Sequence, residues 1–221
     1  MPVDVAAVIS CAVIKGFGSV LSAGVELFSS VAVLGTGAVG LNAIQGSVYC
    51  GAHPVIAVDT QEQRLAAARQ FGATTTINPK KVDDIIAAVK EATDGNGADY
   101  VFVTVTTSNE EILRQAIEMS SPRGVIVRIA VGGHMRPDPN APPPDIEWAR
   151  GLAEMRASRR VMFTMMGSSN IIVDIPRYIS LYKAGRLKLD ELITARYPLD
   201  RINEAIEHMA SGRALRTLVV M

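Results

Sequence analysis

The sequence predicts an α/β protein with a doubly wound parallel sheet. Short apolar runs alternate along the chain with segments whose apolar residues recur at helical spacing, a pattern typical of βαβ units. The apolar runs contain few polar residues, as is usual for strands buried on both faces of a parallel sheet. Right-handed crossovers then give the strand order 3-2-1-4-5, with a sixth strand expected beyond the fifth.

Each element of this fold has a local signal. Gly72 stops the alanine-rich helix expected at residues 61–71, and the turn residues from Asp94 to Gly97 end the next helix. Strands are expected at residues 31–34, 55–58, 75–77, 100–105, 125–130 and 161–165, and helices at residues 17–28, 38–49, 61–71, 82–93, 109–119 and 146–157.

The remaining segments are less regular. Residues 132–145 are rich in proline and predict an exposed loop. Residues 175–184 and 201–210 show helical spacing, and residues 215–220 indicate a final strand. Arg128 is unusual for the fifth strand, because a charged residue there is expected to be buried.

The composition excludes several classes of protein. The chain has 221 residues, 48% of them hydrophobic, and 22 basic residues balance 22 acidic ones. Zero net charge gives no attraction to nucleic acid or to an anionic membrane, so neither is expected as a partner. Two cysteines form no disulfide framework, which suits the cytoplasm. No basic region precedes Asp4 to make a signal peptide, and no apolar stretch is expected to be long enough to span a membrane.

Residues 31–40 read VAVLGTGAVG, a buried strand followed by a GxGxxG turn and a helix. This pattern favours the dinucleotide fingerprint of a Rossmann fold over a glycine turn in another α/β domain. Gly35 makes the tight turn, Gly37 lets a pyrophosphate approach the backbone, and Gly40 lets the helix lie close to the sheet. The helix that begins with Ala38 and Val39 offers free N–H groups and its positive dipole end to the phosphates.

An acidic residue, Asp59, ends the second apolar run, nineteen positions after Gly40. A carboxylate there accepts hydrogen bonds from the ribose 2′-OH and repels a 2′-phosphate, so NAD is predicted as the cofactor rather than NADP. Arg64 lies close enough in sequence to reach the same ribose, where its charge would weaken that preference. It could equally be a solvated helix residue.

Several segments together resemble a known family, the C-terminal part of the medium-chain zinc-dependent alcohol dehydrogenases, including the glutathione-dependent formaldehyde dehydrogenase branch. The resemblance covers residues 3–220 and rests on CAVIKGFGSV, VAVLGTGAVG, VIAVDTQEQRLAAARQFGATTTINP, NGADYVF and LITARYPLDRINEAIEHMASGRALRTLVV. It implies the NAD-binding portion of an oxidoreductase that transfers hydride between an alcohol or aldehyde and NAD. It also implies a homodimer formed through the edge strand at residues 161–165.

The resemblance implies roles for individual residues. Val39 would pack near the nicotinamide, Asp59 and Arg64 would lie at the adenosine ribose, and Arg216 would reach the pyrophosphate. Cys11 would be the third protein ligand of the catalytic zinc. Two alternatives stay open, since Cys11 could be a small buried hydrophobe and Arg216 a surface charge. The implied domains are a remnant of the catalytic domain at residues 1–15, an NAD-binding domain at 16–166 and a segment returning to the catalytic domain at 167–221.

The zinc site implied by the family is expected to be incomplete. Its other ligands belong to an N-terminal GroES-like domain that the chain is expected to lack, and His53, His134 and His208 are not suited to replace them. A catalytic zinc needs three protein ligands. No catalytic residue is therefore assigned, and we expect NAD binding without efficient alcohol oxidation. The chain could be a truncated or split dehydrogenase, a stand-alone NAD(H)-binding module, or a non-functional remnant.

Overall fold

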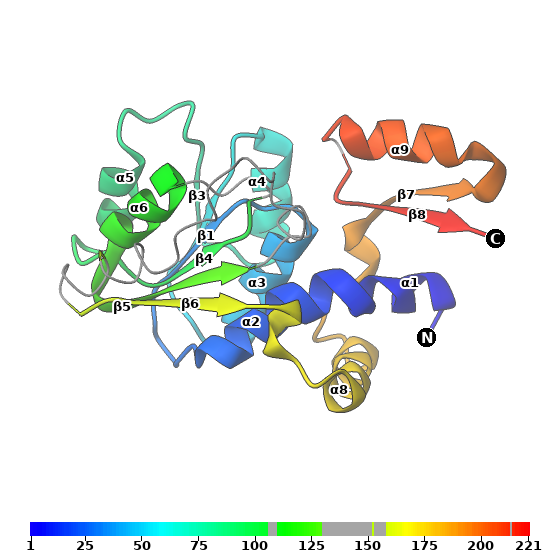
Figure 1. Cartoon of the computed structure of the whole chain (residues 1–221), viewed down its shortest axis with the longest axis horizontal. Coiled ribbons are helices and arrows are strands. Elements are labelled where there is room, and N and C mark those ends of the chain that lie inside the picture. Colours follow the sequence, from blue (N-terminus) through cyan, green and yellow to red (C-terminus); the bar gives the residue numbers. More distant parts are fainter. Residues whose placement is uncertain (106–109, 130–151, 153–157, 213) are drawn as a thin grey trace, which may run out of the picture.

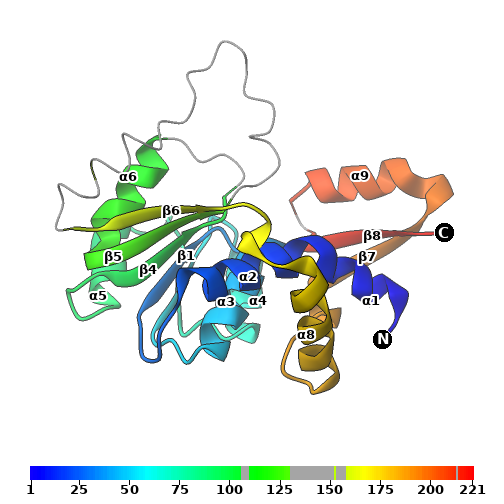
Figure 2. The ribbon, with the colours of Figure 1, turned by 60° about the horizontal axis from the view of Figure 1, so that its bottom comes forward.

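The computed structural model describes residues 1–105, 110–129, 152, 158–212 and 214–221. Figure 1 shows a twisted parallel sheet with helices on both faces, and beside it a smaller unit of two strands and one helix. Both termini lie at the side of the molecule where α1, β7 and β8 meet (Figures 1 and 2). The expected loop at 132–145 and the expected helix at 146–157 fall almost wholly outside the described residues.

The large sheet confirms the predicted fold class. Its strands are all parallel and follow the order β3-β2-β1-β4-β5-β6. The strand order therefore reverses between β1 and β4, which are hydrogen-bonded neighbours. The strands are β1 (Val31–Leu34), β2 (Val55–Val58), β3 (Thr75–Ile77), β4 (Ala98–Val103), β5 (Ser120–Ile129) and β6 (Arg160–Thr164).

Alternate residues of each central strand pack into two separate cores. Val31 and Val33 join one core with helices from the N-terminal half, while Ala32 and Leu34 join the other with α5 and α6. Burial on both faces explains the unbroken apolar runs. The helices of the sheet domain are α1 (Val3–Val8), η1 (Ile9–Val13), α2 (Ile14–Ala23), α3 (Ala38–Tyr49), α4 (Glu62–Gln70), α5 (Ile85–Glu91) and α6 (Glu110–Met119).

The first helix differs from the prediction at both ends. Helix was expected at residues 17–28, but a continuous helical segment runs from Val3 to Ala23, with one π turn formed by η1. Gly24 ends it in the left-handed conformation, at φ +69°, where glycine is favoured. Phe28, expected inside the helix, is instead exposed in the turn before β1.

The same segment corrects the expectation that no apolar stretch is long enough for a membrane. Val3–Ala23 has 21 residues and a mean hydropathy of 1.8, so it passes that test by length and composition. Much of it is buried against the sheet domain, with Val5, Val13 and Phe17 in the core. A core helix meets the same criteria as a membrane span.

A second unit follows β6. It consists of β7 (Ile193–Pro198), α9 (Ile202–Ala210) and β8 (Arg216–Val220), with the two strands parallel. The sequence analysis missed β7. An ion pair joins the unit to the N-terminal helix, since Arg196 Nε and Nη2 lie 2.8 and 2.7 Å from the same Asp4 oxygen, Oδ2. The connecting helices are η3 (Met166–Ser168), α8 (Ile171–Lys183), η4 (Asp190–Leu192) and η5 (Leu199–Arg201).

Several other helices and strands begin or end a few residues away from the limits expected from sequence. Helix α8 was expected to begin at residue 175 but begins at Ile171. Pro176 therefore lies inside the helix and not in its first turn. Strand β4 begins and ends two residues earlier than expected, and β5 begins at Ser120. Arg128 is buried in β5, as the sequence indicated, and that burial lowers the pKa of its guanidinium. The domain limits stay a prediction.

Candidate cofactor-binding site

The glycine turn between β1 and α3 is held from both neighbouring strands. Gly35 adopts φ +92°, a conformation that favours glycine, and its N–H donates to the Val58 carbonyl of β2 at 2.8 Å. From the end of β4, the Thr104 hydroxyl lies 3.0 Å from the Leu34 carbonyl oxygen and 2.5 Å from that of Gly35. The turn is therefore fixed at the point where the strand order reverses, the usual ligand site of such sheets.

The other two glycines of the motif have opposite surroundings. A Cβ on Gly40 would lie only 1.9 Å from the Gly35 carbonyl oxygen, whereas a Cβ on Gly37 would meet nothing within 4 Å. Gly40 thus allows α3 to approach the turn, and Gly37 faces open space. Gly37 is also the N-cap of α3 and supplies no side-chain cap. The N–H groups of Ala38 and Val39, in the first turn of the helix, are available to an anion at its positive end.

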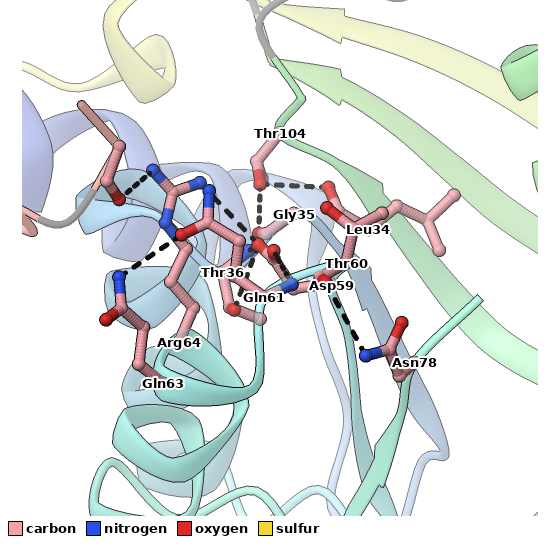
Figure 3. Close-up of polar contacts among 11 residues, drawn as sticks. Leu34, Gly35, Thr36, Asp59, Thr60, Gln61, Gln63, Arg64, Asn78 and Thr104 are labelled. Atoms are coloured by element: carbon pink, nitrogen blue, oxygen red, sulfur yellow. Dashed lines mark hydrogen bonds and ion pairs between the residues drawn. The ribbon is translucent and has the colours of Figure 1, made fainter. Parts of the chain in front are cut away.

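The Asp59 carboxylate lies directly beside the turn (Figure 3) and is almost fully buried, with 7% of the residue exposed. Its Oδ2 accepts the Thr36 N–H at 2.8 Å and the Thr36 hydroxyl at 3.2 Å. Its Oδ1 accepts the Gln61 N–H at 3.0 Å. The acid of β2 and the glycine turn of β1 therefore form one hydrogen-bonded unit.

Arg64 joins this unit to the C-terminal part of the chain. Its Nη1 lies 3.8 Å from Asp59 Oδ2, and its Nη2 donates to the Gly212 carbonyl at 3.0 Å. Its Nε is buried and has no hydrogen-bond partner in the described part of the chain. Arg64 therefore lies beside Asp59, and its contact with the adenosine ribose stays a prediction.

A cavity of about 440 Å³ opens at these residues. It lies at the carboxyl ends of β1, β2 and β4, where it has the size of a small-molecule site. The tail closes one side, through the last turn of α9 and the residues that follow it before β8. The residues that line it come from the glycine turn, from the ends of β2 and β4, from the helices beside them and from the tail. They are Leu34, Gly35, Gly37, Val58, Asp59, Thr60, Arg64, Pro79, Ile85, Thr104, Val105, Ile112, Gln115, Met209, Ala214 and Leu215.

These features fit a dinucleotide. Gly37 and the buried Asp59 carboxylate line one cavity, and the free N–H groups of Ala38 and Val39 follow directly after Gly37. A diphosphate and a ribose can therefore be held side by side. Sequence reasoning missed Thr36 and Thr104, and it missed the tail residues Met209, Ala214 and Leu215. Thr104 carried a usable signal, since it follows a strand at the reversal of strand order. The tail residues carried none, because they come from the other end of the chain.

Five predicted site residues are not among those that line this cavity. Ala38, Val39 and Gly40 follow the turn at the start of α3, while Arg216 and Cys11 lie elsewhere. Arg216 begins β8, where its carbonyl accepts the Thr194 hydroxyl at 3.0 Å, and it is not among the described residues that line the cavity. Its proposed contact with the pyrophosphate stays a prediction. Cys11 is half-buried within the π turn of the first helix.

The described residues do not fit a zinc site. Within residues 1–105, 110–129, 152, 158–212 and 214–221, no group of three or more His, Cys, Asp and Glu side chains could hold a metal ion. Cys11 is a single candidate ligand, while a catalytic zinc takes three from protein. His208 lies with its Nδ1 3.2 Å from the Thr217 hydroxyl in the tail unit, and His53 is exposed before β2.

Comparison with known families agrees with this geometry. The family model described as zinc-binding dehydrogenase matches residues 38–182, about two thirds of the chain. The chain belongs to the zinc-binding dehydrogenase family. The matched residues include the helix after the glycine turn and Asp59. The family membership and the six-stranded sheet confirm the resemblance inferred from sequence.

Individual relatives are alcohol dehydrogenases. The chain is 32% identical to an NDMA-dependent alcohol dehydrogenase of Amycolatopsis methanolica, covering 100% of the chain and 57% of that relative. It is 34% identical to a probable S-(hydroxymethyl)glutathione dehydrogenase 1 of Schizosaccharomyces pombe, covering 96% and 53%. The crystal structure of benzyl alcohol dehydrogenase from Acinetobacter calcoaceticus superimposes with a TM-score of 0.86 at 29% identity, covering 99% of this chain and 57% of that one.

This member of the zinc-binding dehydrogenase family spans about half the length of the curated relatives it matches. The part matched is their C-terminal part, which corresponds to an NAD-binding portion.

Proposed function

We propose that the chain binds NAD(H) in the cavity at the glycine turn, as the cofactor-binding portion of an oxidoreductase acting on an alcohol or aldehyde. One observation carries this proposal. The open space at Gly37 lies beside the uncapped N-terminus of α3 and on the same cavity as the Asp59 carboxylate. The N–H groups of Ala38 and Val39 would hold the pyrophosphate, and Asp59 would accept the hydroxyls of the adenosine ribose.

The residues of the cavity also favour NAD over NADP. The 2′-phosphate of NADP would place a second negative charge beside the nearly buried Asp59 carboxylate. The 2′-OH of NAD is neutral and is not repelled. Bound NAD would supply the hydride acceptor, and this chain would bind and orient it. Arg64 lies beside Asp59 and is proposed to contact the ribose. Val39 is proposed to pack near the nicotinamide, and Arg216 to reach the pyrophosphate.

A second candidate function is a stand-alone NAD(H)-binding module. The observation in its favour is that the part of the chain the structure describes holds only Cys11 as a candidate zinc ligand and no metal cluster. We propose that the chain by itself does not oxidise alcohols efficiently. Turnover of a primary alcohol by the isolated, zinc-loaded chain at roughly 1 per second, a rate ordinary for enzymes, would overturn this.

We further propose a homodimer formed through β6. This strand is the edge of the large sheet, and Phe163 on it is 39% exposed. An apolar sheet edge readily pairs with another strand. Phe163→Lys should shift the chain from dimer to monomer in analytical ultracentrifugation at tens of micromolar. A wild-type chain that sediments as a monomer would contradict the proposal. A cytoplasmic location is proposed from the two free thiols, Cys11 and Cys50.

The cofactor proposal is tested by calorimetric titration of the whole chain with NADH and with NADPH, with and without zinc. We expect NADH to bind with micromolar affinity, NADPH more weakly, and zinc to change neither value. Asp59→Asn keeps the size of the side chain and removes its charge, so it should weaken NADH binding and narrow the difference from NADPH. Failure of both nucleotides to bind the folded wild-type chain would refute the proposal.

A further inference from the structure

We propose that Thr36 is a positioning residue that sets cofactor selectivity by holding the Asp59 carboxylate from the glycine turn. The inference rests on the proposed NAD(H) site. Thr36 is the residue between the first two glycines of the motif and is fully buried, with 0% exposed. It gives Asp59 Oδ2 two hydrogen bonds, one from its N–H at 2.8 Å and one from its hydroxyl at 3.2 Å.

The hydrogen bonds to Asp59 are unequally divided between its two oxygens. A carboxylate has about four acceptor positions, two on each oxygen. The two donors of Thr36 occupy those of Oδ2, whereas Oδ1 accepts only the Gln61 N–H among the described residues. Arg64 Nη1 is 3.8 Å from Oδ2, beyond hydrogen-bond distance. The oxygen with a remaining acceptor position is therefore Oδ1, and we assign it to the ribose hydroxyl.

Thr36 is itself held in place, so it can act as a support. The preceding Gly35 is tied to β2 through the Val58 carbonyl and to β4 through the Thr104 hydroxyl. Those contacts fix the turn relative to β2, the strand that Asp59 directly follows. The carboxylate is thus held on one oxygen by the turn and on the other by the Gln61 N–H, and it has little freedom to rotate.

A fixed carboxylate discriminates between the two cofactors better than a rotating one. It offers an acceptor to a 2′-OH in a set direction, which favours NADH. It also cannot turn away from a 2′-phosphate, so the repulsion of two negative charges persists. The Thr36 hydroxyl therefore raises the ratio of NADH to NADPH affinity without itself touching the cofactor.

The test compares nucleotide selectivity in three variants of the whole chain. Thr36→Val removes the hydroxyl and keeps the branched shape, and Thr36→Ser keeps the hydroxyl. Thr164→Val is the matched control, because Thr164 is equally buried and its hydroxyl bonds to Ser19 at 2.7 Å, away from the cavity. Calorimetry gives the dissociation constants for NADH and NADPH, and thermal unfolding monitors the fold.

We expect Thr36→Val to reduce the ratio of NADH to NADPH affinity by between about 3-fold and 10-fold, since the worth of one hydrogen bond to a charged group is the upper limit of what holding the carboxylate can contribute. Thr36→Ser and Thr164→Val should leave that ratio within about 3-fold of wild type. An unchanged ratio in folded Thr36→Val, with wild type binding NADH, overturns the role of Thr36 and leaves the proposed function intact. If Thr36→Val does not fold, Thr36→Ala replaces it under the same criterion. A wild-type chain that binds neither nucleotide overturns both proposals.

Discussion

Gly37→Ala and Gly40→Ala should have different effects on the free energy of unfolding, although the two glycines lie in the same motif. At Gly37 the backbone is extended, with φ −68° and ψ −174°, and an added Cβ meets nothing within 4 Å. Alanine fits there without strain and reduces the freedom of the unfolded chain, so stability should stay equal or rise by up to about 1 kcal/mol. The methyl group would, however, occupy the space proposed for the pyrophosphate.

At Gly40 the same methyl group has no space. Its Cβ would lie 1.9 Å from the Gly35 carbonyl oxygen and 3.0 Å from the Thr104 hydroxyl. Normal contact needs about 3.5 Å, so α3 and the turn would have to separate by roughly 1.5 Å. Overpacking of this kind costs about 1–3 kcal/mol or more. We expect Gly40→Ala to lower the unfolding free energy by about 3 kcal/mol.

Two measurements on each variant separate these effects. Urea unfolding followed by circular dichroism gives the free energy of unfolding, and calorimetric titration gives the NADH dissociation constant. Gly37→Ala should unfold like wild type and bind NADH at least about 10-fold more weakly, since one displaced phosphate contact is worth about 1.4 kcal/mol. Wild-type NADH affinity in Gly37→Ala would refute the placement of the pyrophosphate at the turn. Wild-type stability in Gly40→Ala would refute the close approach of α3.

Three further predictions concern single side chains. Arg64→Ala removes the hydrogen bond to the Gly212 carbonyl, so hydrogen exchange of the tail amides should accelerate while the free energy of unfolding changes by less than about 1 kcal/mol. Unchanged exchange would show that Arg64 does not hold the tail in place. Burial, and then Glu26, raise the pKa of Tyr100, so its neutral form stabilises the fold below about pH 10 and this contribution is lost at higher pH. Wild type should therefore lose stability more steeply than Tyr100→Phe in alkaline unfolding, and parallel curves would count against this. Burial raises the pKa of the Cys50 thiol, so iodoacetamide at pH 8 should label it more slowly in folded than in urea-unfolded protein, and equal rates would disprove it.

The parts of the fold that were predicted well have local causes. The bounds of β1, β2, β3 and α3 agree with the sequence analysis at every residue, because apolar runs between glycine and turn residues leave little choice of limits. The first helix was placed wrongly, since it begins at Val3 rather than at residue 17 and ends before Gly24 rather than at residue 28. Strand β7 was missed although its residues alternate between partly buried and exposed positions, with Thr194 and Arg196 on its exposed side.

The sequence by itself determined the α/β class, the glycine turn and the acid at the end of β2, since each depends on residues within about 30 positions. Only the tertiary structure decided how these parts meet. Thr36 reaches Asp59 because neighbouring strands bring the turn and the acid together. Arg64 meets Gly212 across 148 residues of chain, and Met209 closes the same cavity. Periodicity reports the burial of a segment but not its partner, so contacts between distant segments depend on how the packed elements fit.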